Sequence, residues 1–315
     1  MEYTRLGDSG LKISRIGVGT LQASRRHWGA EVNLDEIADA VKRSCELGIN
    51  FIDTAETYGD GEAEELVGRV VKEIGRDRLV IATKVHGKHC RYNDLLKAAE
   101  NSLKRLGLKE IDLYQIHWPD PWEQIPLSQT MAAAERLYKE GKVRAIGVSN
   151  FAVRDIEEAQ AHLSSTEIVS DQVRYNLLQR EIEHDLLQYC RDNGMSILAW
   201  SPLAQGILTG KYDLANKPVD PERSGNRLFA EHNLKQIMRL TAVLRRIAES
   251  RKKTAAQVAV NWLLKKASVV PIPGAKNPRQ AEENAGAVGW SLTSRELRDI
   301  EEAYRTLDLS YYKYQ

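Results

Sequence analysis

Short apolar runs alternate along the chain with segments in which apolar residues recur every three or four positions. The runs have the length of buried strands, and the recurring pattern is typical of amphipathic helices. The clearest helix follows Gly61, where apolar residues form one stripe from Ala63 to Ile74. This alternation predicts a parallel sheet with helices packed outside it. The eight expected strands are 16–19, 51–53, 79–83, 111–116, 143–148, 168–171, 196–200 and 269–272.

Eight strands with helices between them predict a closed (β/α)8 TIM barrel of the α/β class. Residues 3–15, with a turn at 8–10, predict a β-hairpin ahead of the first strand. Two extra helices are expected before the eighth strand, and a further helix closes the chain. With no linker or low-complexity segment in sight, residues 1–315 are predicted to form a single domain. The expected helices are 34–47, 62–74, 92–106, 131–138, 153–159, 182–190, 234–249, 254–266, 279–284 and 294–306.

Composition narrows the classes of function. The chain is 42% hydrophobic and 28% charged, as expected for a globule with a sizeable core. A net charge of +1 gives no reason to expect nucleic acid or an anionic membrane as partner. No apolar signal segment or membrane-length run is present, so we expect a cytoplasmic monomer or small homo-oligomer. Three scattered cysteines indicate neither a disulfide framework nor a zinc site.

Three consecutive apolar runs lead into ionisable side chains. The first ends at Asp53 with Tyr58 in the loop that follows, the second leads into Lys84 and the third into His117. The carboxyl ends of barrel strands carry the active site in enzymes of this fold. We therefore expect these four side chains to meet at one end of the barrel as a catalytic tetrad.

The chemistry of such a tetrad follows from the side-chain types. A tyrosine with a pKa of about 10 is a poor acid near neutral pH unless its phenolate is stabilised. A nearby lysine ammonium stabilises it, and a carboxylate keeps that lysine charged. His117 offers a second donor that can fix a carbonyl oxygen beside Tyr58. The set would protonate an oxygen as hydride reaches the carbonyl carbon; neither a serine or cysteine nucleophile nor metal-ligand spacing is evident.

The tetrad alone leaves a second chemistry open, because a barrel lysine can form a Schiff base in an aldolase. Ser149, Asn150 and Gln172 end the fifth and sixth strands and suit a carboxamide. Trp200 ends the seventh strand and offers a flat face for an aromatic ring. Two loops, 201–211 and 273–276, have the backbone amides and lysines that bind phosphates. An aldolase has no use for these parts together, so hydride transfer is favoured.

The same residues carry a resemblance to a known family. The chain resembles the aldo-keto reductases from end to end, and most of all the bacterial and archaeal members related to aryl-alcohol dehydrogenases and potassium-channel β subunits. The resemblance rests on the motifs Asn50–Ala55 with Tyr58-Gly59, Thr83-Lys84, Gln115–Asp120, Gly141–Phe151, Trp200–Leu203 and Pro271–Gly274.

The resemblance implies a barrel that binds extended NADP(H) without a Rossmann fold and acts on a small carbonyl or alcohol substrate. It implies that Tyr58 is the general acid, that Lys84 lowers its pKa, that Asp53 pairs with Lys84 and that His117 orients the carbonyl. The nicotinamide end would contact Gly19, Thr20, Leu21, Asp53, Ser149, Asn150, Gln172 and Trp200. The pyrophosphate would lie at Ser201, Pro202, Leu203, Gln205, Gly206 and Lys211. The adenosine end would contact Gly274, Lys276, Gln280, Glu283 and Asn284.

One position departs from the family pattern. Gln280 stands where many members have an arginine that clamps the 2′-phosphate, so Lys276 is the expected phosphate partner here. Trp28, Trp118, Tyr58 and His117 are the expected substrate-contacting residues. Aldehydes, ketones, sugars and aryl alcohols all stay open as substrates. A second hypothesis is a cofactor-bound sensor or accessory subunit with slow turnover, as channel β subunits suggest.

Overall fold

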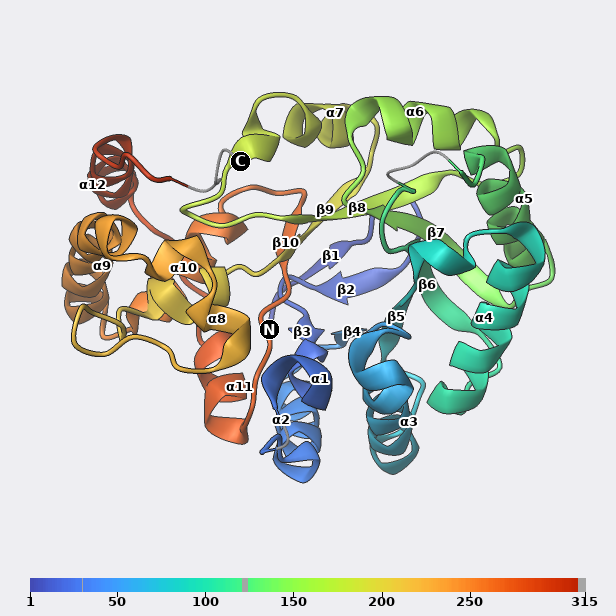
Figure 1. Ribbon diagram of the computed structural model, residues 1–315, viewed down its shortest axis with the longest axis horizontal. Coiled ribbons are helices and arrows are strands. Elements are labelled where there is room, and N and C mark those ends of the chain that lie inside the picture. The colour runs from blue at the N-terminus through green and yellow to red at the C-terminus, as the bar shows by residue number, and fades with distance from the viewer. Residues whose placement is uncertain (30, 121–123, 311–315) are drawn as a thin grey trace.

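The computed structural model describes residues 1–29, 31–120 and 124–310. Eight parallel strands, β3 to β10, pair in chain order in one curled sheet with helices around it (Figure 1). The ring closes where Gly17 N–H donates to Pro271 O (2.9 Å) and Gly19 N–H donates to Pro273 O (3.1 Å). The predicted (β/α)8 barrel is confirmed. Its strands are β3 (Val18–Gly19), β4 (Phe51–Asp53), β5 (Val80–Val85), β6 (Ile111–Ile116), β7 (Val143–Ser149), β8 (Ile168–Arg174), β9 (Ser196–Trp200) and β10 (Val269–Pro271).

Most predicted helices are present with boundaries close to those expected. Asn33 caps the first long helix, because its side chain accepts hydrogen bonds from the backbone amides of Asp35 and Glu36. The last helix begins with a capping box formed by Thr293 and Glu296. The α-helices are α1 (Arg25–Trp28), α2 (Leu34–Glu46), α3 (Glu62–Ile74), α4 (Tyr92–Leu106), α5 (Leu127–Lys139), α6 (Val153–Ala161), α7 (Leu186–Asp192), α8 (Pro221–Ser224), α9 (Glu231–Arg251), α10 (Ala255–Leu264), α11 (Pro278–Ala285) and α12 (Ser294–Arg305).

Two predicted segments differ from the structure. Ile182, expected in the same helix as Cys190, lies in a separate 3-10 turn, η4 (Glu181–Glu183). The α-helix starts later because the Asp185 side chain accepts a hydrogen bond from the Leu186 amide and begins α7 there. The expected loop 201–233 contains η5 (Ala204–Thr209), α8 and η6 (Arg227–Phe229), and α9 begins at Glu231 rather than at 234.

The predicted N-terminal hairpin pairs β1 (Tyr3–Arg5) with β2 (Lys12–Ser14) and closes the barrel end opposite the carboxyl ends of the strands. Figure 1 shows this hairpin across the centre of the ring. Leu6 and Ile13, both fully buried, join a cluster with inward-facing strand residues such as Phe51 and Val270. The hairpin therefore completes the core and leaves only one end of the barrel available for a site.

No helix within the described residues is both long and apolar enough to cross a membrane.

Replacing Ile13 by alanine tests the role of the hairpin. We expect the free energy of unfolding to fall by about 2–5 kcal/mol, since the Ile13 side chain is fully buried in the cluster that the hairpin forms with the barrel strands. The control Lys12→Ala changes an exposed neighbour on the same strand and should cost less than about 1 kcal/mol. Urea denaturation measures both. Equal losses for the two variants would contradict the assignment of the hairpin to the barrel core.

Candidate active site

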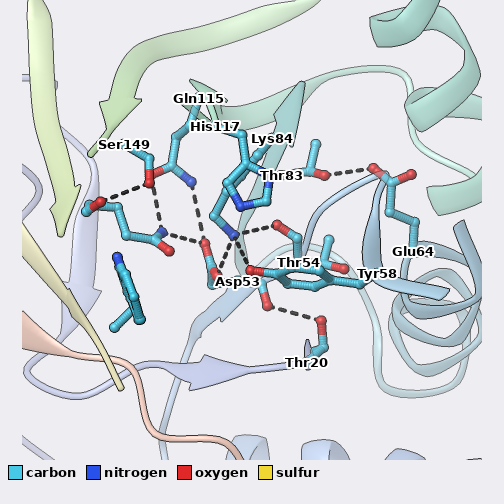
Figure 2. A network of polar contacts seen from close by, with 12 residues as sticks. Thr20, Asp53, Thr54, Tyr58, Glu64, Thr83, Lys84, Gln115, His117 and Ser149 are labelled. Atoms are coloured by element: carbon cyan, nitrogen blue, oxygen red, sulfur yellow. Dashed lines mark hydrogen bonds and ion pairs between the residues drawn. The ribbon is translucent and has the colours of Figure 1, made fainter. Parts of the chain in front are cut away.

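The Lys84 ammonium lies at the centre of a polar network at the carboxyl end of the barrel (Figure 2). Its Nζ is 2.7 Å from Asp53 Oδ1, 2.8 Å from Thr54 O and 3.2 Å from the Tyr58 hydroxyl. Its side chain is fully buried, and that of Asp53 is 4% exposed. The sequence positions predict that Asp53, Tyr58 and Lys84 meet, and their side chains lie in contact here.

Strand alternation explains why Lys84 points into the barrel. Its neighbour Thr83 faces the helices and donates a hydrogen bond to Glu64 Oε1 on α3 (2.6 Å). Arg105 on α4 satisfies the other oxygen of that buried carboxylate. The strand is thus fixed from outside by Glu64 and presents Lys84 inward to Asp53.

Two glutamines hold the second oxygen of the Asp53 carboxylate. Gln172 Nε2 lies 2.8 Å from Asp53 Oδ2, and Gln115 Nε2 lies 3.3 Å from it. Gln172 is expected from the sequence at the cofactor, and no role is predicted for Gln115. A signal for Gln115 exists, because it lies two residues before His117, which directly follows the same strand, and residues two apart face the same side. Both carboxylate oxygens are therefore fixed, which orients Asp53 toward Lys84.

Protonation states follow from this packing. Burial works to lower the pKa of Lys84, but the charge of Asp53 and the Tyr58 hydroxyl outweigh it and raise the pKa. Burial raises the pKa of Tyr58, and the Lys84 charge opposes that rise. Near neutral pH, a neutral phenol thus faces a charged ammonium. A lysine held protonated is a poor amine nucleophile, which argues against the Schiff-base alternative.

His117 packs edge-on against the Tyr58 ring, with centroids 5.9 Å apart and an interplanar angle of 75°. Its Nδ1 is buried without a hydrogen-bond partner in the described part of the chain. Burial, followed by the charges of Lys84 and His86, lowers its pKa to about 3. The imidazole is therefore neutral near pH 7 and can orient an oxygen by a hydrogen bond. The predicted tetrad is complete in space.

The residues expected to hold a carboxamide lie beside the tetrad. Ser149 Oγ donates to Gln172 O (2.7 Å), and Asn150 Nδ2 contacts Ser149 Oγ (2.9 Å) and His117 O (3.1 Å). Asn150 has a φ of +61°, which few non-glycine residues adopt. This constrained turn links the ends of β6, β7 and β8.

The Trp200 indole is fixed at the end of β9. Its Nε1 donates to Asn150 Oδ1 (3.0 Å), and the Arg174 guanidinium lies 5.8 Å from its ring centre. The ring is half-buried. Trp200 thus belongs to the same hydrogen-bonded group as Asn150, and its stacking role stays a prediction.

Thr20 joins the first strand to the tetrad. Both its amide and its hydroxyl lie 3.0 Å from the carbonyl oxygen of Asp53 as donors (Figure 2). Gly19 pairs with Asp53 in the sheet, and Leu21 begins the 3-10 turn η1 (Leu21–Ala23). The three residues predicted to lie beneath the nicotinamide are therefore adjacent to the tetrad.

The loop after Trp200 is held in an unusual backbone conformation. Ser201, Ala204 and Gln205 have φ values of +52°, +47° and +56°. Strained residues of this kind cluster at ligand-binding sites because the surroundings must hold them in place. Gln205 N–H donates to Ser201 Oγ (3.2 Å), and its Oε1 accepts from Asn226 Nδ2 (2.7 Å).

We call residues 201–211 the η5 loop. All the residues predicted to contact the pyrophosphate lie in this loop. Pro202 is buried, and Leu203 O accepts a hydrogen bond from Gly206 N (2.8 Å). Lys211 is exposed at its end. Asn226, which the sequence analysis did not select, ties the loop to the segment before η6.

The loop after β10, which we call the β10 loop, is ordered by α11. Asn284 Nδ2 donates to Gly274 O (3.1 Å), and Gln280 Oε1 accepts from the Lys276 amide (2.9 Å). Gln280 therefore supports the loop backbone. Glu283 contributes its carbonyl oxygen to Gln257 Nε2 (2.9 Å). The expected adenosine-binding residues thus lie on one loop and one helix.

Cations from two separate segments meet at the Trp28 ring. Lys276 Nζ lies 4.3 Å and Arg223 Cζ 5.3 Å from the Trp28 ring. Burial lowers the pKa of Lys276, and so do the charges of Arg223 and Lys211, whereas Asp220 raises it. Positive charges placed this close to Lys276 favour a bound anion. Arg223 is not among the predicted residues, because no local sequence pattern distinguishes it.

Of the residues expected to contact substrate, Tyr58 and His117 face each other. Trp118 follows His117 and is 50% exposed. Trp28 on α1 contacts Arg223 and Lys276, and its substrate role stays a prediction.

Comparison with known proteins agrees with this arrangement. The model of the Aldo/keto reductase family matches residues 15–305. The chain belongs to this family.

Other aldo/keto reductases match along nearly the whole chain. Aldo-keto reductase YhdN of Bacillus subtilis is 36% identical over 95% of this chain and 92% of its own length. The NADH-specific methylglyoxal reductase of Escherichia coli is 30% identical over 96% and 99% of the two chains. The aldo/keto reductase of Klebsiella pneumoniae, solved with NADP and acetate, is 30% identical with a TM-score of 0.78 and covers 99% of this chain and 98% of its own.

The neutral state of His117 predicts a pH dependence of stability. The unfolded histidine takes up a proton below about pH 6.5, while the folded one stays neutral to a pKa of about 3. Stability is therefore present above pH 6.5 and lost as the pH falls toward 3. From pH 7 to pH 5, the wild type should lose about 2 kcal/mol more free energy of unfolding than His117→Gln. Urea denaturation at both pH values measures this. Equal losses in the two proteins would show that His117 is not buried as a neutral ring.

Proposed function

We propose that this aldo/keto reductase is an NADP(H)-dependent oxidoreductase that reduces aldehyde or ketone carbonyls to alcohols. The observation that carries the proposal is the Tyr58 hydroxyl at 3.2 Å from a fully buried Lys84 ammonium, with His117 edge-on beside it. This is a proton donor placed next to a fixed positive charge. Such a pair serves a reaction in which negative charge develops on an oxygen.

The residues around the tetrad fit a nicotinamide dinucleotide phosphate. The amide and hydroxyl groups of Ser149, Asn150 and Gln172 match the donors and acceptors of a carboxamide. Trp200 offers an aromatic face, and the cations Lys211, Arg223 and Lys276 suit phosphates. The relative from Klebsiella pneumoniae, solved with NADP, supports this assignment. When bound, the cofactor supplies the hydride.

Tyr58 supplies the proton. As charge builds on the substrate oxygen, the Tyr58 hydroxyl donates its proton there, and Lys84 stabilises the phenolate that remains. Asp53 keeps Lys84 charged and aimed at Tyr58 through the 2.7 Å contact. His117, neutral near pH 7, donates a hydrogen bond that orients the same oxygen. In alcohol oxidation the phenolate of Tyr58 takes the proton back.

The substrate would approach Tyr58 and His117 from the open end of the barrel, beside the half-exposed Trp118. A small carbonyl compound fits this proposal. Methylglyoxal is a suitable first substrate, because the name of one relative assigns it that activity. A panel of aldehydes, ketones and aryl alcohols would then define the class.

Tyr58→Phe tests the proton donor. We expect kcat for carbonyl reduction to fall by about 10²–10⁴, since the phenol is removed and its ring retained. The dissociation constant for NADPH should stay within about threefold of the wild-type value, because Tyr58 lies on the substrate side. Steady-state kinetics and fluorescence titration measure the two quantities. Tyr58→Phe with near-wild-type kcat would overturn the assignment of Tyr58.

Lys276→Met tests the phosphate partner. We expect affinity for NADPH to fall about tenfold and affinity for NADH to change little, because one charge-assisted contact to the 2′-phosphate is lost. The control Lys265→Met removes an exposed lysine that contacts Ser291. Titration with both cofactors gives the ratio. An unchanged NADPH-to-NADH ratio in Lys276→Met would place the 2′-phosphate elsewhere.

A further inference from the structure

Gln22 lies on η1, directly after the residues expected beneath the nicotinamide. Its side chain spans the gap to the β10 loop. A Cβ built on Gly274 would lie 1.9 Å from Gln22 Oε1 and 2.1 Å from its Nε2. The Gly274 backbone does not adopt the left-handed conformation that favours glycine. The Gln22 amide therefore lies directly against the Gly274 backbone, where a Cβ would displace it.

The Gln22 amide lies over the seam that closes the barrel. Gly19 and Gly274 form a parallel bridge there, and the Gly19 amide donates to Pro273 O (3.1 Å). On one side of the seam, Thr20 bonds to Asp53 of the tetrad. On the other side, Asn284 on α11 bonds to Gly274 O. Gln22 is thus placed between the two ends of the proposed cofactor site.

The Gln22 side chain has unused hydrogen-bonding capacity. Its Oε1 is buried and has no hydrogen-bond partner among the residues that the structure describes. A buried amide oxygen without a partner carries the full free-energy cost of its lost hydration. Rotating the amide by 180° exchanges oxygen and nitrogen and leaves a buried donor in the same place. In either orientation a hydroxyl group satisfies it, since a hydroxyl both donates and accepts.

We propose that Gln22 binds a ribose hydroxyl of the dinucleotide at this seam. The proposal rests on the proposed function, in which the bound molecule is NADP(H). A phosphate would satisfy only the rotated amide, because phosphate oxygens have no hydrogen to give to Oε1, whereas a hydroxyl satisfies both orientations. The ribose bound by Gln22 then bridges the η1 turn and the β10 loop, which connects the nicotinamide side of the site with the adenosine side.

Gln22→Met is the decisive variant. Methionine keeps the length of the side chain and its packing beside Gly274 but cannot form the amide hydrogen bond. We expect the dissociation constant for NADPH to rise about three- to tenfold, the worth of one hydrogen bond. Fluorescence titration measures binding without turnover. The control Gln188→Met changes an exposed glutamine on α7 that contacts Asp192, and it should bind NADPH as the wild type does.

Two nucleotide fragments identify the ribose. Weaker binding of 2′,5′-ADP to Gln22→Met would assign the contact to the adenosine ribose. Weaker binding of nicotinamide mononucleotide would assign it to the nicotinamide ribose. Either result supports the proposal. Gln22→Ala repeats the titration if the methionine variant does not fold, as thermal unfolding will show. NADPH binding within twofold of wild type in the folded variant overturns the proposal while the proposed function stands. A wild-type protein that binds no nicotinamide dinucleotide overturns both.

Discussion

The site depends on one buried ion pair, between Lys84 and Asp53. Two charges taken out of water lose much of their hydration, and their attraction offsets this only when the geometry is good and the remaining hydrogen-bonding groups are satisfied. Here every partner is supplied by the barrel. Lys84 also contacts Thr54 O and the Tyr58 hydroxyl, and two glutamines bond to Asp53 Oδ2. Removing either charge would leave the other buried and unpaired, so the site and the core beneath it are coupled.

This requirement connects elements that are distant in the chain. Asp53 is held by β6 and β8 through their glutamines and by Thr20, the residue directly after β3. The β3 strand in turn meets the segment after β10, where the barrel closes. The hairpin packs into the barrel core through Leu6 and Ile13. The Lys84–Asp53 ion pair therefore depends on closure of the ring of strands as well as on the residues that contact it.

The features that could be predicted from the sequence are those encoded by local patterns, such as strand ends and helix caps. Strand ends place Asp53, Lys84 and His117 in register, and side-chain caps mark the start of α2 and of α12. Contacts that depend on tertiary packing had no such signal. Arg223 reaches Trp28 from a short helix inside a segment expected to be a loop, and Gln22 meets a glycine from the far end of the chain. The strained backbone at Ser201, Ala204 and Gln205 was likewise hidden, because those residue types give no hint of positive φ.

The rate of hydride transfer in Lys84→Met tests the central claim most directly. Stopped-flow fluorescence of bound NADPH, mixed with the best carbonyl substrate, measures that step apart from product release. If the Lys84 charge stabilises the Tyr58 phenolate, the variant should be less stable than wild type, and its folded fraction should bind NADPH yet transfer hydride about 10² or more times slower. A folded Lys84→Met protein that transfers hydride within tenfold of the wild-type rate would contradict the account.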